Sequence, residues 1–418
     1  MALDRELLDP ALAGQSQARL VSFSLKGLFG GHDIELAFPG PHDEEAEATI
    51  LILSGQNGAG KTTVFKMIDG MLKLDFDMFR QVPFTSCSLT LSTGETLFVR
   101  SIKDKTFPLE VEFGEHKVKL LRNRTAGRYN PEHDRAIGLF RSFALPIVRS
   151  VEYRFLPVDR SSYQRDREKI IERGRDHQAK YVASLSEQVA RFLSVAQIDY
   201  RRFFRDEELG VIPRLLHRMQ GPQLTKSRDE LLSRIDNLKK KQPLMIRYGL
   251  HFDYDVINAI ESLITQDNEF GDSQLILLET YVEMQEGAQR AKDLITRRLQ
   301  EFDNIMADFL FEKAIRIDAA KGLSIVSSAG QDLSEEDLSS GEYHFLYMMV
   351  AALLCQRTGS VIAIDEPELS LHVKWQRKLV SALARCASGA SPLFLFATHS
   401  VAISAQHADR LVELSPVD

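Results

Sequence analysis

The chain has few cysteines and no long hydrophobic run. Its 418 residues include three cysteines, and none of them is spaced as a Cys-x-x-Cys pair. This usage argues against a disulfide framework and against a structural zinc site. An uncharged run of about 18 residues, which a membrane-spanning helix needs, is absent, and no basic and apolar leader follows Met1. We therefore expect a cytoplasmic protein without a membrane anchor.

The chain also has no excess of basic residues, and its formal net charge is −7. A negative chain is not expected to bind nucleic acid over its whole surface, although a local basic patch stays compatible with this charge. Hydrophobic residues make up 44% and charged residues 27% of the chain, which is ordinary for a globular protein. The length allows two or three domains.

Residues 55–62 read Gly-Gln-Asn-Gly-Ala-Gly-Lys-Thr, a complete G-x-x-x-x-G-K-T motif. The apolar run 49–54 before it predicts a buried strand, and residues 62–73 after it have helical periodicity. Strand, glycine-rich turn and helix form the context in which this motif binds phosphate. Lys61 would reach the β- and γ-phosphates, and the Thr62 hydroxyl would bind Mg²⁺. The sequence therefore predicts ATP and Mg²⁺ as cofactors.

Two further apolar runs end in polar residues that suit the same chemistry. Residues 361–364 predict a strand buried on both faces, as in a parallel sheet, and Asp365 and Glu366 follow it. Asp365 is placed to hold Mg²⁺, and Glu366 to deprotonate an attacking water. Residues 393–397 predict another buried strand, after which His399 could contact a γ-phosphate. The alternatives are an acidic loop after the first strand and a structural histidine at the end of the second, and both are less favoured on a chain with a phosphate loop.

Four segments resemble the Walker A, signature, Walker B and switch-histidine motifs of ABC-type ATPases: residues 55–62, 338–342, 362–368 and 398–400. The stretch Asp-Glu-Pro-Glu-Leu-Ser-Leu-His from residue 365 is similar to soluble heads of the SMC, Rad50, RecF and overcoming-lysogenization kind. Within that group the chain resembles compact ATPases of antiphage systems such as Septu, PARIS and the retron-associated ATPases. The resemblance covers roughly the two ends of the chain.

The resemblance implies an α/β fold, namely an ABC-type P-loop NTPase with a mixed sheet, an antiparallel β-layer and an inserted α-helical or short coiled-coil domain. It also implies a homodimer or higher oligomer, because in this family the signature of one subunit caps the ATP bound by another. Ser340 stands where the family often has the first glycine of its signature. The family's metal-contacting glutamine is not placed, and Gln81 and Gln164 are both candidates.

The site residues that follow from the motif and the resemblance fall into three groups. The catalytic residues would be Glu366 as the base and His399 as the switch. The metal ligands would be Thr62 and Asp365. The nucleotide-binding residues would be Gly55, Gln56, Asn57, Gly58, Ala59, Gly60, Lys61, Thr62, Thr63, Ser339, Ser340, Gly341 and Glu342.

We expect four segments: an N-terminal extension (1–17), the N-terminal part of the ATPase lobe (18–158), a helical insert (159–313) and the C-terminal part of the lobe (314–418). Strand patterns dominate the first part of the lobe and predict the antiparallel β-layer: residues 20–25, 33–38, 86–91, 96–102 and 109–113. After residue 160 the pattern changes to long helices.

Apolar residues of the insert repeat at alternating spacings of four and three, with one charged exception. The longer series is Leu277, Tyr281, Met284, Ala288, Ala291, Ile295, Arg298, Phe302, Ile305 and Phe309. A shorter series is Val182, Leu185, Val189, Phe192 and Ala196. A short coiled coil and an ordinary helical bundle both fit this pattern.

Charge divides the insert into two halves. Residues 160–247 contain 20 Lys and Arg against 12 Asp and Glu, whereas residues 248–313 contain 5 against 14. The two halves could pair with each other, or the basic half could bind DNA, RNA or an acidic protein. Internal pairing is favoured, because no nucleic-acid-binding motif accompanies the basic clusters at 201–205 and 239–241.

These observations lead to three hypotheses for function. The first is an ATP-hydrolysing sensor or scaffold that controls a separate effector, a nuclease or toxin, in an antiphage defence system. The effector is expected to be another polypeptide, because the 19 residues after His399 leave no room for a nuclease domain. The second is a DNA-repair or chromosome-associated ATPase of the RecF and SMC kind. A transporter ATPase is the least supported, since the segment after Glu366 points to soluble heads.

Overall fold

The computed structural model describes residues 18–40, 48–56, 58–121, 131–157, 184–219, 227–250, 255–266, 272–319 and 321–414. The chain divides into two compact units. The first combines residues 1–180 with residues 339–418, and the second comprises residues 181–338. The first unit therefore contains the phosphate loop together with the distant segments that carry Asp365 and His399.

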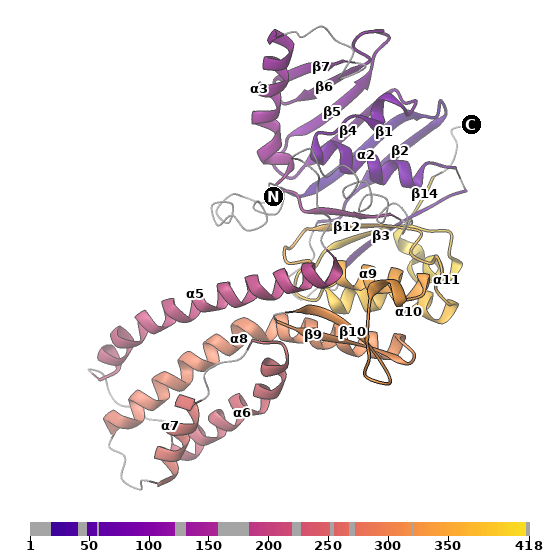
Figure 1. The fold of residues 1–418 in the computed structure, drawn as a ribbon. Helices are drawn as coiled ribbons and strands as arrows, with labels where there is room; N and C mark the ends of the chain where they lie inside the picture. The colour runs from indigo at the N-terminus through magenta and orange to yellow at the C-terminus, as the bar shows by residue number, and fades with distance from the viewer. Residues whose placement is uncertain are drawn as a thin grey trace. The chain divides into compact units, whose positions relative to one another are not determined.

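A five-stranded parallel sheet lies in the first unit (Figure 1). Its order is β14 (Leu411–Glu413), β3 (Thr49–Ser54), β13 (Leu393–Ala397), β12 (Val361–Asp365) and β8 (Tyr153–Leu156). Every residue of β12 and β13 is buried, as their unbroken apolar sequences predict for strands covered on both faces. The order places β13 directly between β3 and β12, so that the carboxyl ends of these three strands meet at one edge of the sheet.

The predicted antiparallel β-layer is a six-stranded sheet of the same unit. Its order is β2 (His32–Ala37), β1 (Leu20–Leu28), β4 (Ser86–Leu91), β5 (Thr96–Ser101), β6 (Leu109–Phe113) and β7 (His116–Leu120). Apolar side chains of this sheet share one core with Leu51, Leu53 and Leu395 of the parallel sheet. The patterns had predicted five of these strands; β7 was missed, because lysines alternate with its only two buried residues.

Helices flank the parallel sheet. Helix α2 (Lys61–Lys73) follows the phosphate loop and buries Val64, Phe65 and Ile68, as its periodicity predicted. Helix α3 (Pro131–Val148) was not predicted; it contacts α2 and β7. Helix α9 (Ser340–Leu353) packs on β12, and α10 (Val373–Cys386) packs against α9. Within the described part of this unit, the remaining helical pieces are η2 (Met78–Arg80), α11 (Val401–Ser404) and η4 (Ala405–Arg410).

The second unit is mainly helical. Helices α5 (Leu185–Met219) and α8 (Asp272–Phe309) lie side by side, and α6 (Arg228–Arg247) packs on α8 and α7 (Asp255–Gln266) (Figure 1). A small antiparallel sheet with the order β11 (Asp332–Leu333), β10 (Gly322–Ser327) and β9 (Lys313–Asp318) completes the unit, followed by η3 (Glu335–Asp337). No helix within the described residues is both long enough and apolar enough to cross a membrane.

The predicted seam of α8 is only partly buried. Met284, Phe302 and Ile305 are buried, whereas Leu277 is 52% exposed. Polar side chains of α8 are buried instead at nearby positions: Thr280, Gln285, Gln289, Lys292 and Thr296. Because α8 contacts both α5 and α6, it buries more than one stripe, and a bundle describes this unit better than a two-stranded coiled coil.

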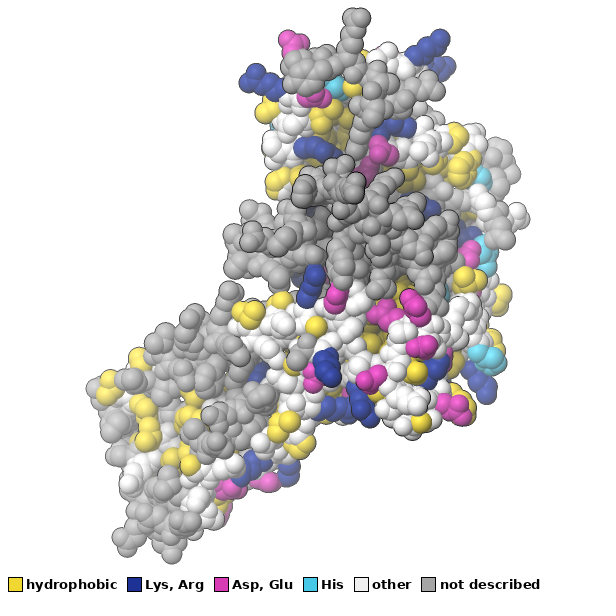
Figure 2. Space-filling model, viewed as in Figure 1, with side chains coloured by type: hydrophobic (Ala, Val, Ile, Leu, Met, Phe, Trp, Pro, Cys, Tyr) yellow, Lys and Arg dark blue, Asp and Glu magenta, His cyan; other side chains and the backbone are white. Residues whose placement is uncertain are grey.

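The two charged halves of the insert pair with each other. The Arg234 guanidinium donates to both carboxylate oxygens of Glu286, each at 2.8 Å. In the lysine cluster, Lys239 pairs with Glu261 and Lys241 with Asp293 at 2.7 Å, so α6 is bonded to α7 and α8. On the face drawn in Figure 2, basic and acidic side chains are intermixed over the described surface. The side chains of the other cluster, 201–205, lie outside the described residues.

Candidate functional site

The phosphate loop connects β3 to α2 through backbone conformations that favour glycine. Gly58 and Gly60 have φ angles of 87° and 92°. The torsion at Gly60 disfavours a side chain, and a Cβ atom there would also lie 2.5 Å from the Leu28 Cδ2 atom, so that Leu28 would have to shift. These turns leave the N-terminus of α2 directed at the loop, where its free N–H groups can bind an anion. Asn57 lies outside the described residues.

Lys61, the first residue of α2, is 6% exposed. Its ammonium donates to the carbonyl oxygens of Gly55 at 2.8 Å and Gln56 at 3.3 Å, and it lies 2.6 Å from the His399 Nε2 atom. Burial lowers the pKa of Lys61, and the negative charges of Glu366, Asp365 and Glu368 oppose this shift. The ammonium of Lys61 is thus held at the edge of the sheet, where it faces the histidine that follows β13.

Thr62 and Asp365 are joined by a hydrogen bond. The Thr62 hydroxyl donates to Asp365 Oδ2 at 2.7 Å. Asp365 is 3% exposed, and its other oxygen, Oδ1, is buried without a hydrogen-bond partner in the described structure. Burial is also the main reason that the pKa of Asp365 is raised. A buried carboxylate oxygen beside a hydroxyl is a donor set that Mg²⁺ accepts, so the residues present fit this ion.

Glu366 follows the last residue of β12 and has an unusual backbone. Its φ angle is 43°, which a non-glycine residue rarely adopts, and its N–H donates to Ala397 O at 2.7 Å. Such conformations persist where the surrounding structure enforces them, and they are concentrated at functional sites. Among the carboxylates that act on Lys61, Glu366 has the largest effect. Its negative charge is therefore close to the phosphate loop, as a water-activating base requires.

The signature segment begins α9 and is stabilised locally. Ser339 is the N-cap: its hydroxyl accepts from Glu342 N at 3.3 Å, and its own N–H donates to Glu342 Oε2 at 2.7 Å. Ser340 is exposed, whereas Gly341 is buried, and a Cβ atom there would lie 2.3 Å from Ser370 O. Within the described residues, no hydrogen bond joins Ser340 or Gly341 to the phosphate loop.

The structure describes one of the two candidates for the metal-contacting glutamine, Gln81, and within the described residues no hydrogen bond joins it to the site. Gln81 is exposed and ends the short helix η2, where its N–H donates to Met78 O at 2.9 Å. Gln164 lies outside the described residues. Sequence reasoning also gave no role to Glu368 and Gln376, both of which contact the segment around His399. The Asp-Glu-Pro-Glu stretch was the one available signal for Glu368.

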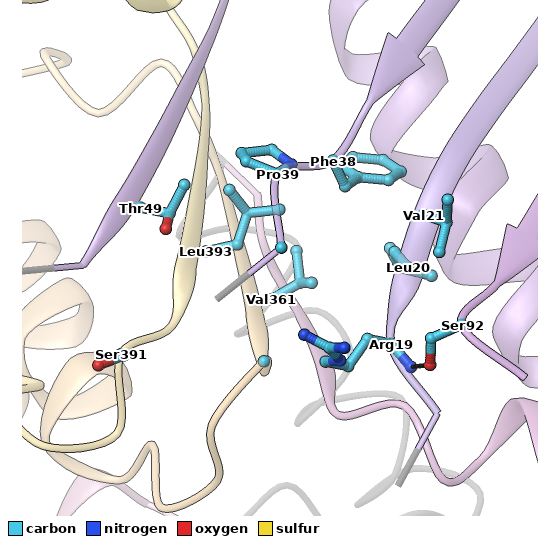
Figure 3. Close-up of a pocket in the computed structure, with 12 residues that line it drawn as sticks. Arg19, Leu20, Val21, Phe38, Pro39, Thr49, Ser92, Val361, Ser391 and Leu393 are labelled. Atoms are coloured by element: carbon cyan, nitrogen blue, oxygen red, sulfur yellow. Dashed lines mark hydrogen bonds between the residues drawn. The ribbon is translucent and has the colours of Figure 1, made fainter. Parts of the chain in front are cut away.

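A pocket of about 250 Å³ lies elsewhere in the first unit (Figure 3). Its lining includes Thr49, Val361 and Leu393, the first residues of three parallel strands, together with Arg19 and Phe38. The phosphate loop leaves β3 at the opposite, carboxyl end. The pocket is therefore distinct from the candidate site, although part of its lining comes from the same strands.

The chain is similar to one protein family and to several solved structures. The family model AAA_21, described as "AAA domain, putative AbiEii toxin, Type IV TA system", matches residues 50–405. No curated protein sequence matches the chain. Solved structures with similarity include an Smc head domain of Pyrococcus furiosus with an extended coiled coil, bound to the C-terminal domain of ScpA. It is 13% identical, with a TM-score of 0.44 over 93% of this chain and 91% of that chain.

Two further Smc structures are similar at the same identity. An Smc head bound to the C-terminal winged-helix domain of ScpA is 13% identical, with a TM-score of 0.36, and the match covers 96% of this chain and 98% of that one. An Smc head domain with a coiled coil and joint from Pyrococcus yayanosii is also 13% identical, with a TM-score of 0.36 and coverage of 95% of both chains.

Proposed function

Because the chain belongs to the AAA_21 family, we propose that it binds ATP with Mg²⁺ and hydrolyses the bond between the β- and γ-phosphates. The family model spans the phosphate loop, Asp365, Glu366 and His399. The observation that carries the proposal is the meeting of three strand ends at one edge of the parallel sheet. Lys61 lies beside His399, and Thr62 is bonded to Asp365, although each pair is separated by more than 300 residues in sequence.

Each residue then has a distinct task. Backbone N–H groups of the loop and the Lys61 ammonium bind the phosphates, and Lys61 exchanges its carbonyl and histidine partners for phosphate oxygens. Thr62 and Asp365 would hold Mg²⁺, which when bound supplies positive charge for the phosphate oxygens. Glu366 accepts a proton from the attacking water. His399 faces the γ-phosphate and orients it.

We further propose that two copies complete each other's sites. Ser340 is exposed at the N-terminus of α9, where the helix presents a partial positive charge. A phosphate of ATP bound to a second copy suits such a position. The absence of a hydrogen bond between Ser340 or Gly341 and the phosphate loop, within the described residues, agrees with a signature that acts on the partner. The proposed assembly is a homodimer or a higher oligomer.

For the cellular role, we propose a sensor or scaffold in antiphage defence that controls a separate nuclease or toxin in the cytoplasm. The description of the family names a putative AbiEii toxin and a type IV TA system, which supports a place in such a system. The DNA-repair alternative depended on the basic half of the insert. The ion pairs of Lys239, Lys241 and Arg234 with acidic residues weaken that alternative.

Phosphate release and molecular mass together test this proposal. The purified protein is incubated with ATP and Mg²⁺, phosphate release is measured, and Glu366→Gln is examined with ATP by light scattering. We expect turnover by the unmodified chain and a nucleotide-dependent increase in mass for the variant. Absence of phosphate release under all conditions would reject the enzymatic part. Recovery of a nuclease or toxin with the tagged chain from cells with the native locus tests the defence role, and recovery of repair proteins would contradict it.

A further inference from the structure

We infer that Glu368 is a positioning residue that holds the segment 398–400 and thereby sets the orientation of His399 toward the phosphate loop. The inference rests on the proposed ATP hydrolysis and goes beyond it. It assigns to Glu368, the second glutamate of the Asp-Glu-Pro-Glu stretch, a task that is distinct from the task of Glu366.

Both carboxylate oxygens of Glu368 are engaged by consecutive residues beyond β13. Oε1 accepts from the backbone N–H of His399 at 2.8 Å, and Oε2 accepts from the Thr398 hydroxyl at 2.7 Å. Hydrogen bonds to an ionised group are stronger than neutral ones. The strand ends at Ala397, and the backbone N–H of Thr398 still donates to Leu53 O at 3.2 Å, so the bond from Glu368 to the His399 N–H continues the support of this segment beyond the sheet. Glu368 therefore acts as a clamp on the backbone that carries the imidazole.

Gln376 of α10 supports the clamp from a second side. Its Nε2 atom donates to Leu371 O at 2.9 Å and, more weakly, to Glu368 O at 3.4 Å. Its Oε1 atom accepts from the Ser400 hydroxyl at 2.8 Å. One side chain thus joins the loop after β12 to the residue after His399. The segment 398–400 is consequently held at both ends, and mainly the side-chain torsions of His399 are left free.

This arrangement favours a positioning task for Glu368 over a task as general base or metal ligand. A general base needs a lone pair directed at water, and a metal ligand needs one directed at the ion. One lone pair of each Glu368 oxygen is already used by Thr398 or His399. In contrast, Asp365 retains a buried oxygen without a partner in the described structure. The geometry therefore separates a metal ligand, Asp365, from a residue that acts through His399.

A double-mutant cycle tests this assignment. Glu368→Ala, His399→Ala and the double variant are compared by single-turnover hydrolysis and by equilibrium ATP binding. Glu368→Ala should lower the hydrolysis rate by about 10- to 100-fold, because misplacement of a reacting group costs this much, and change ATP affinity little. The double variant should hydrolyse ATP no more slowly than His399→Ala, since the two substitutions remove the same function. Independent, multiplicative effects or an unchanged rate for Glu368→Ala would overturn the inference.

The conservative variant and a matched control sharpen the result. Glu368→Gln retains one carbonyl acceptor and should be intermediate, whereas Glu115→Gln, at the exposed turn between β6 and β7, should match the unmodified chain. If Glu368→Ala does not fold, Thr398→Val tests the same clamp, because it removes the bond to Glu368 Oε2 together with the bond that the Thr398 hydroxyl accepts from Ser400 N at 2.9 Å. Equal rates for Glu368→Gln, Thr398→Val and the control would reject the clamp.

A readout without hydrolysis separates this inference from the proposed function. The histidine ring signals of the ¹⁵N-labelled protein are recorded without nucleotide, and His399 is assigned by loss of its signal in His399→Gln. The His399 signal should shift in Glu368→Gln and Thr398→Val, because the segment that carries the ring is released. An unmodified chain without turnover would reject the proposed function alone. A His399 signal that stays in place in both variants would reject the clamp, whatever the activity.

Discussion

At the scale of single residues, the site depends on a few polar atoms that have no substitute. Lys61 is the buried cation of the loop, and Asp365 has the buried carboxylate oxygen that is left over after its bond to Thr62. Buried charged groups that lose a partner are costly, so their removal should have large and specific effects. Binding and hydrolysis can therefore be separated by variants at adjacent positions.

Lys61→Ala should weaken ATP binding by about 100-fold or more, because two or more charge-assisted bonds to phosphate are lost. Equilibrium titration with a fluorescent ATP analogue measures this change. Lys73→Ala, at the exposed end of the same helix, is the matched control and should bind normally. Near-normal affinity of Lys61→Ala would show that the nucleotide does not use this loop.

Glu366→Gln should retain ATP binding and lower hydrolysis by about 10²- to 10⁴-fold, because the side chain keeps its size and loses its basicity. Phosphate release and ATP affinity are measured on the same preparation. Normal turnover by this variant would remove Glu366 from the role of base and direct attention to other carboxylates at the same edge.

At the scale of elements, the helical unit contains ion pairs between its helices and buried polar groups on α8, which are unusual for a coiled coil. Buried polar groups cost free energy unless they are paired, and they make an element sensitive to pH. Lys292 is 3% exposed, and its ammonium donates to Leu250 O. The lysines of α6 instead pair at or near the surface.

Replacement of Lys239, Lys240 and Lys241 by Ala should lower the melting temperature by a few degrees, because partly exposed pairs contribute about 0.2–1 kcal/mol each. Nucleic-acid binding should be undetectable in both proteins at physiological salt. Calorimetry and fluorescence anisotropy with duplex DNA and RNA measure the two quantities. Tight binding that falls with salt and is lost in the triple variant would return the DNA-repair hypothesis to first place.

The free energy of unfolding should rise between pH 7 and pH 9, and Lys292→Met should abolish this rise. Burial lowers the pKa of Lys292 to about 7, below the value of the unfolded chain. In this pH window the unfolded chain binds more protons at this residue than the folded one, so deprotonation favours folding. The free energy of unfolding is compared for both proteins by denaturant titration at pH 7 and pH 9. An identical pH slope would show that Lys292 stays charged in the fold.

At the scale of the whole molecule, the open question is whether the exposed start of α9 completes the site of a second copy. Ser340 is a better probe than Gly341, because any side chain at Gly341 would displace the backbone of Ser370. Ser340 is exposed, so a large charged residue there changes the surface and leaves the fold intact.

Ser340→Arg should keep ATP affinity and suppress turnover, because the site is blocked only when the partner docks. A mixture with Lys61→Ala should recover part of the activity, since a mixed dimer contains one complete site. Turnover is measured at several mixing ratios, after mass photometry or affinity capture with two tags has shown that mixed dimers form. Normal turnover by Ser340→Arg alone would contradict a signature that acts on the partner.

The sequence by itself determined the local structure of the site. Neighbouring residues encode each local part of the site: the strand 49–54, the glycine turn, the start of α2, the apolar runs of β12 and β13, and the capping box at Ser339. Together they were sufficient for the α/β class, which is confirmed, and for a nucleotide-binding domain, which agrees with the AAA_21 family to which the chain belongs. They were sufficient because glycine torsions, N-caps and apolar runs depend on contacts within a few residues.

Only the tertiary structure decided which of these segments meet. The order β3, β13, β12 places His399 next to Lys61 and Asp365 next to Thr62, across 338 and 303 residues. The clamp of Glu368 and the ion pairs of α6 depend in the same way on pairings between distant segments. Periodicity shows that a side chain is buried or exposed, but the partner is set by strand order and helix packing. The physical reason is that such contacts form only when distant parts of the chain are packed together.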